Sequence, residues 1–252
     1  MPLPNALRGI WRTRSFGGEA GHPFMITIVC GTRHSAHDFA ETTPLGASLK
    51  RLAFDKRINT RIAFGGNPGL PVVYNKALEA PDVAEILVFI HDDVWIDDYF
   101  FSDRIEAALQ SFDIIGVAGN RRRVARQPSW AHGAPGQDNV FTKDRENHSG
   151  AVAHGKTAFG PVDYFGPTPA ACELLDGVLL AAKRDALRSA GVGFDEQFDF
   201  HFYDMDFCRS AKAAGLSLGC WAIAITHGSV GPGLGKPDWR RNYRKYLKKW
   251  GE

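Results

Sequence analysis

The sequence predicts a single α/β domain with a largely parallel central sheet flanked by helices. Two short apolar runs, at residues 25–30 and 85–90, have the length and composition of buried strands. Helical segments separate these and further apolar runs at the spacing typical of β-α-β units. The chain has 252 residues, which is enough for one large domain with a substantial core.

The expected elements follow in a regular order as far as residue 118. We predict strands at residues 25–30, 60–64, 85–90 and 114–118, and helices at 45–56, 72–80 and 99–111. Residues 119–166 are polar and rich in glycine, so we assign no element there and expect a long active-site loop. Beyond it we predict a strand at 174–182, helices at 183–190 and 203–214, a strand at 217–225 and a helix at 237–250.

The chain is expected to have three parts. Residues 1–23 form an irregular lead-in, residues 24–236 form the α/β domain, and residues 237–252 form a basic, aromatic helix. No apolar run approaches the roughly 18 to 20 residues that cross a bilayer. Residues 1–21 hold no apolar stretch of the signal-peptide type, so secretion is not expected.

Composition and charge exclude several classes of protein. Hydrophobic residues make up 44% of the chain and charged residues 23%, as in ordinary globular proteins. The net charge of only +2 argues against a nucleic-acid-binding protein, which needs a broad basic surface. The four cysteines are scattered and form no C-x-x-C pair, so we expect reduced thiols and a cytoplasmic protein.

The first candidate site follows the apolar strand at 85–90. His91, Asp92 and Asp93 stand where that strand ends, and ligands of open α/β sheets gather at such ends. Adjacent carboxylates repel each other unless a cation lies beside them, and Mg²⁺ or Mn²⁺ takes oxygen ligands that it often shares with substrate phosphates. A solvated strand end is the alternative interpretation.

Aspartates and aromatic residues alternate in the second candidate site, at residues 198–208. If a helix begins near Tyr203, Asp204 and Asp206 occupy its first turn, where capping is an alternative role for a carboxylate. Residues two apart do not share a helix face, so we expect the two carboxylates to do different things. The aromatic residues lower the local water content, which favours an acid–base role for one of them.

A histidine, His227, and two glycines follow the strand at 217–225 and make the third candidate site. A histidine just after a buried strand can reach back across a site while a flexible loop moves. A structural histidine is the alternative interpretation.

Together these residues resemble a known enzyme family. From about residue 25 to the C-terminus the sequence resembles the GT-A-fold glycosyltransferases of the family-2 type, and most closely the streptomycin-biosynthesis-type glycosyltransferase-like domain. The order and separation of several motifs carry the resemblance, namely residues 74–77, 90–94, 176–177 and 200–208 and His227. It implies a Rossmann-like, mostly parallel central sheet flanked by helices.

The resemblance implies a metal site and a catalytic base. Asp93 matches the aspartate that reaches the metal and the diphosphate, and His227 matches a late histidine that completes the metal shell. Asp204 matches the catalytic base. His91 and Tyr203 stand where many relatives have an aspartate and a glutamate.

The resemblance also implies which residues bind the nucleotide sugar. Thr32 and Arg33 fall where the nucleotide base is bound, and Asp176 and Gly177 fall where the donor sugar and the acceptor are contacted. The full set expected to bind the donor is Thr32, Arg33, Asn75, His91, Asp92, Asp93, Asp176 and Gly177.

The implied activity is transfer of a sugar, with inversion and with Mn²⁺ or Mg²⁺, from a nucleotide-diphosphate sugar to an acceptor hydroxyl. A UDP-sugar is the favoured donor, and the acceptor is a carbohydrate or a lipid-linked molecule. A metal-dependent nucleotidyltransferase or phosphohydrolase is an alternative, since it can use the same carboxylates around a nucleotide. A binding module that has lost transfer is another, because of His91 and Tyr203.

Two further segments allow two interpretations each. Residues 119–166 contain several arginines and Trp130, which suit either a mobile lid with a stacking surface for sugar or a solvated basic loop. The C-terminal helix repeats aromatic residues at helical spacing among six basic residues. It either contacts the anionic inner face of a membrane or packs its aromatic face on the domain.

Overall fold

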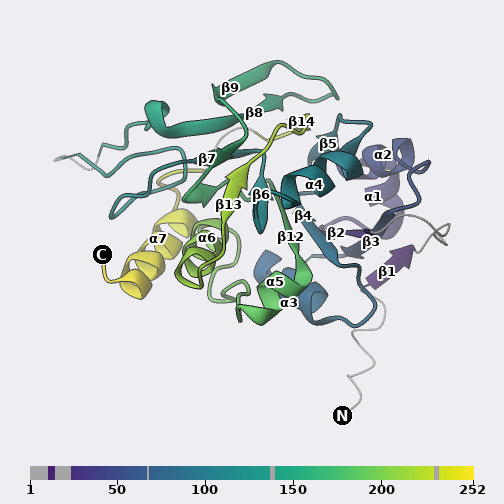
Figure 1. The fold of residues 1–252 in the computed structure, drawn as a ribbon, viewed down its shortest axis with the longest axis horizontal. Coiled ribbons are helices and arrows are strands. Elements are labelled where there is room, and N and C mark those ends of the chain that lie inside the picture. Colours follow the sequence, from purple (N-terminus) through teal and green to yellow (C-terminus); the bar gives the residue numbers. More distant parts are fainter. Residues whose placement is uncertain (1–10, 15–23, 67, 137–139, 230–232) are drawn as a thin grey trace, which may run out of the picture.

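The fold consists of two β-sheets flanked by seven α-helices in the part of the chain that the computed structural model describes, residues 11–14, 24–66, 68–136, 140–229 and 233–252 (Figure 1). The larger sheet has the strand order β1 (Trp11–Arg14), β3 (Ile58–Ala63), β2 (Ile26–Gly31), β4 (Ile86–Ile90), β12 (Leu179–Lys183), β6 (Ile114–Gly116), β13 (Leu218–Cys220) and β10 (Ala170–Ala171). The smaller sheet has the order β11 (Leu174–Leu175), β7 (Ala118–Asn120), β8 (His148–His154), β14 (Ile225–His227) and β5 (Val94–Ile96), and β9 (Val162–Gly166) pairs with β8.

Helices cover both faces of the larger sheet. In Figure 1 one layer lies above it and contains α1 (Ala36–Thr42), α2 (Pro44–Arg51) and α4 (Phe101–Leu109). The layer below contains α3 (Leu70–Glu79) and α5 (Arg184–Ser189), and α6 (Tyr203–Ala213) and α7 (Pro237–Trp250) lie side by side at one end. The predicted α/β class is confirmed.

Alternation along the central strands explains why both faces are apolar. On β4, Leu87 and Phe89 pack into the core under α3 and α6, whereas Val88 and Ile90 pack into the core under α2 and α4. Successive side chains of a strand point to opposite faces, so a strand covered on both sides reads as one continuous apolar run. This is why the run at 85–90 identified its strand from sequence alone.

The larger sheet is mixed rather than mostly parallel. Strands β3, β2 and β4 are parallel neighbours, and β6 is parallel to β13, but β12 runs antiparallel to both β4 and β6. The chain leaves β6 and builds most of the smaller sheet before it returns as β12. Since no crossover helix carries it back to the starting end of the sheet, β12 runs in the opposite direction.

Two predicted elements differ in extent from those of the structure. The helix expected at 45–56 corresponds to α2, which ends at Arg51, and α1 is a separate helix that was not predicted and that meets α2 at Thr43. The Thr43 hydroxyl accepts from Gly46 N and donates to the Phe39 carbonyl, and Pro44 follows at the first helical position. The strand expected at 217–225 is divided between β13 in the larger sheet and β14 in the smaller one.

Residues 119–166 are not the structureless loop that we expected. They contain β8 and β9, which pair with each other in antiparallel register, and a short 3₁₀ helix (Arg145–Asn147). Strand β8 also pairs with β7, which precedes it in the sequence, and with β14, which follows it. Such long-range pairing compensates for a polar, glycine-rich sequence that has little intrinsic strand preference.

Part of the predicted lead-in is ordered. Trp11–Arg14 forms β1 at the edge of the larger sheet, antiparallel to β3, so the expectation of an irregular segment was wrong there. The rest of that prediction, residues 1–10 and 15–23, lies outside the described residues.

The C-terminal helix α7 has the bounds that we predicted, and its aromatic face packs on the domain. Trp239 and Tyr246 are buried in the core shared with α6, and the guanidinium of Arg209 lies 4.0 Å from the Trp250 ring centroid. Asp206 accepts hydrogen bonds from Lys249 Nζ and Trp250 Nε1 at 2.9 Å each. The packed interpretation of this helix therefore describes the structure, and no helix in the described part of the chain is long and apolar enough to span a membrane.

Candidate active site

A cleft of about 1690 Å³ opens at the carboxyl ends of β2, β3 and β4. Its walls come from chain segments far apart in sequence, and they include Thr32, Arg33, His91, Asp92, Asp93, Trp130, His154, Tyr164, Asp176, Gly177, Phe200, Tyr203, Asp204 and His227. This edge of an open α/β sheet is where ligands bind.

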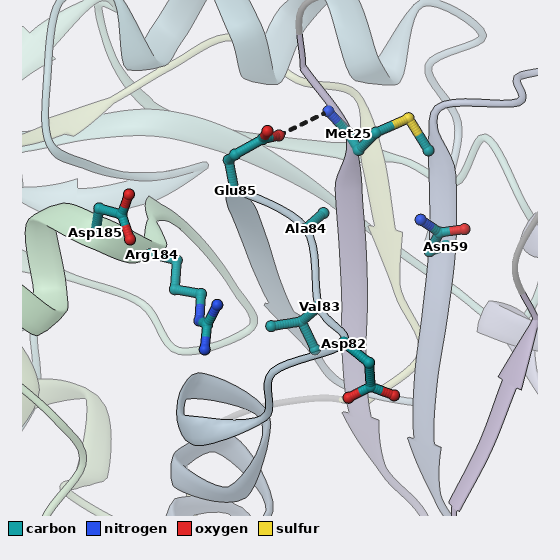
Figure 2. A pocket seen from close by; sticks show the side chains of 8 residues that line it. All are labelled: Met25, Asn59, Asp82, Val83, Ala84, Glu85, Arg184 and Asp185. Atoms are coloured by element: carbon teal, nitrogen blue, oxygen red, sulfur yellow. Dashed lines mark hydrogen bonds between the residues drawn. The ribbon is translucent and has the colours of Figure 1, made fainter. Parts of the chain in front are cut away.

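A smaller pocket of about 350 Å³ lies at the opposite edge of the same strands, and Figure 2 shows its lining. Two of its charged residues, Glu85 and Arg184, have structural partners. Glu85 accepts a hydrogen bond from Met25 N at 3.3 Å, and Arg184 donates to the carbonyls of Leu78 and Ala80 at 2.9 and 2.7 Å. The chemistry therefore belongs to the larger cleft.

Three side chains in the cleft form a candidate metal site. His91, Asp93 and His227 offer ligand atoms that all lie within 4.8 Å of one another. His91 follows the last residue of β4, and Asp93 precedes β5. Strand β14 pairs with β5 so that His227 stands opposite Val94. This pairing brings His227 beside Asp93, although the two residues are far apart in the sequence. The structure therefore brings together the first and third candidate sites of the sequence.

Asp93 is held as a carboxylate by its neighbours. His227 Nε2 lies 3.3 Å from Asp93 Oδ1, the Ser229 hydroxyl donates to Asp93 Oδ2, and Gly228 N donates to the Asp93 carbonyl at 2.7 Å. Burial opposes the charge, but the hydrogen bonds and charge of His227 outweigh it and lower the pKa of Asp93 to about 2. Asp93 raises the pKa of His227 in return, against the effect of burial. The role of Ser229, which follows His227 by two residues, was not predicted from the sequence.

His91 completes the group. Burial lowers the pKa of its imidazole, and this outweighs the opposite effect of Asp93, so the surroundings favour the neutral ring. Its Nε2 lies 2.9 Å from the Tyr203 hydroxyl, and its ring centroid lies 6.0 Å from that of His227. A neutral imidazole is the form in which histidine binds a metal.

These donors fit a first-row transition ion. Two imidazole nitrogens and one carboxylate oxygen suit first-row transition ions as a class, whereas Mg²⁺ prefers a shell made of oxygen alone. Of the two ions that the sequence predicted, the donor set therefore favours Mn²⁺.

Asp92 takes a different direction from its neighbour Asp93. Its Oδ2 accepts a hydrogen bond from the Thr32 hydroxyl at 2.5 Å, and Thr32 Oγ1 also accepts from His34 N. This bond joins the ends of β4 and β2 on the wall of the cleft, where Arg33 also lies. Three residues predicted to bind the donor, Thr32, Arg33 and Asp92, therefore share one wall of the cleft.

Asp204 lies in the same cleft at the first turn of α6. Its two oxygens accept from Met205 N at 2.8 Å and from Gly177 N at 3.1 Å. Burial, with the nearby charge of Asp176, raises the pKa of Asp204 to about 7, even though these hydrogen bonds lower it. Asp206 instead faces α7 and binds Lys249, so the two aspartates have different roles as predicted. A half-buried carboxyl with a pKa near neutrality can exchange a proton with a ligand in the cleft.

Residues 62–226 match the model of a glycosyltransferase-like family, which is well over half of the chain. The chain belongs to the glycosyltransferase-like family. Its fold is mixed α/β, with a central sheet between layers of helices. No curated protein sequence matches this glycosyltransferase-like chain significantly.

The solved structures to which the chain is similar include glycosyltransferase complexes. The mannosyltransferase PcManGT from Pyrobaculum calidifontis, in complex with GDP-Man and Mn²⁺, is 12% identical over 92% of this chain and 65% of that one, with a TM-score of 0.47. GalNAc-T7 with UDP, GalNAc and Mn²⁺ is 10% identical over 89% of this chain and 48% of that one, with a TM-score of 0.49. The glycosyltransferase-like chain thus spans 65% and 48% of the lengths of these two proteins.

Trp130 does not present its indole N–H to a ligand. The N–H donates to Asp176 Oδ2 at 2.7 Å, and the ring packs against His148 and Phe165, with centroids 5.3 and 5.2 Å away. Val178 N donates to the other oxygen of Asp176. Trp130 lines the cleft, but its contacts make it a partner of Asp176 that sequence analysis could not identify, because 46 residues separate the two.

The arginines at the start of residues 119–166 do not line the cleft, namely Arg121, Arg122, Arg123 and Arg126. Arg122 makes two bonds to Asp144, at 3.1 and 2.7 Å, and Arg123 binds Glu252 at 2.6 Å. They tie the segment to itself and to the C-terminus, which agrees with the alternative to a lid. The cations that do line the cleft are Arg33, Lys143, Arg145 and Lys236, of which sequence analysis predicted only Arg33.

Asn75 is the one predicted donor-binding residue that the structure keeps out of the cleft lining. Its side-chain amide donates to the Phe194 carbonyl at 2.7 Å and accepts from Phe194 N at 2.8 Å. These bonds hold α3 to the segment that follows α5, because a side-chain amide can replace a backbone partner. The position of Asn75 is thus explained by packing rather than by contact with a ligand.

Proposed function

We propose that the protein is a Mn²⁺-dependent, inverting glycosyltransferase that moves a sugar from a nucleotide-diphosphate sugar to an acceptor hydroxyl. One observation carries the proposal: a carboxyl with a pKa of about 7, Asp204, lines the same cleft as the three-ligand group His91, Asp93 and His227. Membership of the glycosyltransferase-like family supports the reaction class. A role in glycan, polysaccharide or glycoconjugate biosynthesis, and a subtype close to the streptomycin-biosynthesis type, belong to the same proposal.

Asp204 acts on the acceptor. As the acceptor oxygen attacks the anomeric carbon, its proton passes to the Asp204 carboxylate, the new C–O bond forms, and the bond from the anomeric carbon to the diphosphate breaks. The nucleoside diphosphate leaves with the electron pair of the broken bond. A single displacement of this kind inverts the anomeric centre.

His91, Asp93 and His227 would hold the ion, which when bound offsets the negative charge that develops on the leaving diphosphate. Thr32, Asp92 and Arg33 line the wall assigned to the nucleotide. Uridine is the base that we test first, following the family resemblance.

The acceptor in this proposal is a carbohydrate or a lipid-linked sugar. Two exposed aromatic rings in the cleft support it: Tyr164 is 71% exposed and Phe200 is 51% exposed. An aromatic ring exposed in a cleft offers a flat apolar surface on which the apolar face of a sugar ring can pack. The Phe200 ring centroid lies 5.5 Å from that of His91, so the surface adjoins the ligand group.

The variant Asp204→Asn tests the proposal. Binding of a nucleoside diphosphate with Mn²⁺ should survive, while transfer should fall by about 10²- to 10⁴-fold, the range typical of a lost general base. Asp82→Asn is the matched control, because Asp82 lies in the pocket at the opposite edge of the sheet. Unchanged transfer in Asp204→Asn would remove Asp204 from the mechanism.

Product analysis separates this reaction from its alternatives. A glycosylated acceptor and a free nucleoside diphosphate are expected. A nucleoside monophosphate or pyrophosphate as product would indicate a nucleotidyltransferase or phosphohydrolase instead. Tight donor binding without turnover across a broad panel of acceptors would indicate a binding module.

A further inference from the structure

We infer that Tyr203 is a positioning residue that selects the tautomer of His91, so that Nδ1 of His91 is the nitrogen that faces the metal ion. This inference rests on the proposed metal site but concerns a residue outside it. The hydroxyl group of Tyr203 makes two hydrogen bonds, one with His91 Nε2 and one with the Gly177 carbonyl.

The direction of the two hydrogen bonds follows from counting protons. The Tyr203 hydroxyl lies 2.8 Å from the Gly177 carbonyl oxygen, which can only accept, so the single phenolic proton points to Gly177. The same hydroxyl oxygen lies 2.9 Å from His91 Nε2. Since its proton is already used, the oxygen accepts at that contact and Nε2 carries the hydrogen. In the neutral ring Nδ1 then keeps its lone pair for a ligand.

The surroundings of Tyr203 prevent the hydroxyl from turning away. The side chain is 2% exposed, and its ring centroid lies 5.9 Å from that of Tyr74 and 6.0 Å from that of Phe194. A Cβ at Gly177 would lie 2.4 Å from the Tyr203 hydroxyl oxygen, so the glycine backbone closes directly on it. The phenol is therefore confined between a packed aromatic cluster and a fixed carbonyl.

Tyr203 also connects the candidate metal site to the candidate base. It is the first residue of α6, and Asp204 is the second. Gly177 accepts from Tyr203 through its carbonyl and donates to Asp204 through its N–H. The backbone of Gly177 therefore fixes both the hydroxyl that orients His91 and the carboxylate of Asp204.

The inference explains the two positions at which this chain departs from the commoner family pattern. His91 and Tyr203 replace an aspartate and a glutamate, and the structure joins these two replacements by a hydrogen bond. A histidine that binds a metal needs a partner that fixes its tautomer. An aspartate ligand at position 91 would have no tautomer to fix. The two side chains are therefore coupled, because Tyr203 orients the imidazole that His91 offers to the metal ion.

Nitrogen-15 NMR of the metal-free protein tests the tautomer without any substrate. The ring nitrogens of His91, assigned by the signals missing from His91→Gln, should show Nε2 protonated and Nδ1 unprotonated. The opposite pattern in the unmodified protein would overturn the inference, and this measurement does not depend on how any Tyr203 variant folds.

Titration with Mn²⁺, followed by calorimetry, tests the consequence. Tyr203→Phe removes only the hydroxyl, so the His91 tautomers should mix and the affinity for Mn²⁺ should fall by about 10- to 100-fold, the loss usual for the outer partner of a ligand histidine. Tyr243→Phe is the matched control, since its hydroxyl donates to the Arg126 carbonyl away from the ligand group. An unchanged Mn²⁺ affinity and tautomer in Tyr203→Phe would contradict the inference.

The outcome is separable from that of the proposed function. A protein that binds Mn²⁺ through the predicted tautomer but transfers no sugar would refute the transferase proposal and leave this inference standing. A protein that transfers sugar with His91 in the other tautomer would do the reverse.

Discussion

Asp176 and Asp204 lie close enough that the charge of the first, added to the effect of burial, raises the pKa of the second to about 7. The carboxylate of Asp176 is itself held by Trp130 Nε1 at 2.7 Å and by Val178 N at 2.9 Å, so it stays in place. A raised pKa means that Asp204 is protonated below neutrality and becomes a base only as the pH rises through that value.

The first prediction is therefore a pH profile. The rate of transfer at saturating Mn²⁺ should rise with pH through a midpoint near 7, because only the deprotonated Asp204 accepts a proton. In Asp176→Asn the midpoint should move to lower pH, although not to the value of a free aspartate, because burial remains. A midpoint that does not move in Asp176→Asn would show that Asp176 has no influence on the base.

The second prediction concerns the metal ligands. His227→Ala should lower the affinity for Mn²⁺ by more than about 100-fold, which exceeds the loss expected for an outer partner. His154→Ala is the control, because its ring centroid lies 6.0 Å from that of His227 but its atoms fall outside the three-ligand group. Calorimetric titration with Mn²⁺ measures both. Equal losses in the two variants would mean that His227 is not a specific ligand.

The third prediction concerns Gly177. An alanine there would place Cβ 2.4 Å from the Tyr203 hydroxyl oxygen and 2.9 Å from Asp204 Cβ, so one of these side chains must move. We expect Gly177→Ala to lower the free energy of unfolding by about 1 to 3 kcal/mol, as overpacking does. Gly133→Ala should have little effect, since no atom lies within 4 Å of the added Cβ. Urea denaturation compares them, and equal stability of the two variants would count against the packing described.

The fourth prediction concerns the attachment of α7. Asp206 is buried and Lys249 is its cationic partner, so Lys249→Ala leaves a buried carboxylate without its countercharge. Loss of one partner of a buried pair costs about 3 to 5 kcal/mol, and we expect about 1 to 3 kcal/mol here because the lysine is 30% exposed. Lys248→Ala, at an exposed position of the same helix, should leave the denaturation midpoint unchanged. A Lys249→Ala midpoint equal to that of the unmodified protein would show that the pair adds nothing.

The elements predicted well from sequence are those whose pattern is local. The helical spacing of aromatic residues that include Trp239 and Tyr246 predicted α7 with its bounds, and the apolar run before His91 predicted β4. Strands β8 and β9 were missed because their stability comes from pairing with β7 and β14, which a window of sequence does not contain. The direction of β12 likewise depends on the path of the chain around the smaller sheet.

The candidate site divides in the same way. His91 and Asp93 were identifiable because they follow the apolar run at 85–90, and His227 because it follows the strand predicted at 217–225. Asp92 and Asp93 are adjacent in sequence, yet one binds Thr32 and the other joins the two histidines, which only the strand pairing decides. The partners Trp130 and Ser229 carry no local signal for their roles, since each acts on a carboxylate far away in the chain.

The most direct test of the proposed function is the thermal stability of the protein with a nucleoside diphosphate, in Mn²⁺ and in chelator. A ligand that binds only the folded state raises the melting temperature by mass action. UDP, or another nucleoside diphosphate from a small panel, should raise the melting temperature with Mn²⁺ and not with chelator, and Asp93→Asn should abolish the effect. No stabilisation by any nucleoside diphosphate in the presence of Mn²⁺ would contradict the account of this cleft as a donor site.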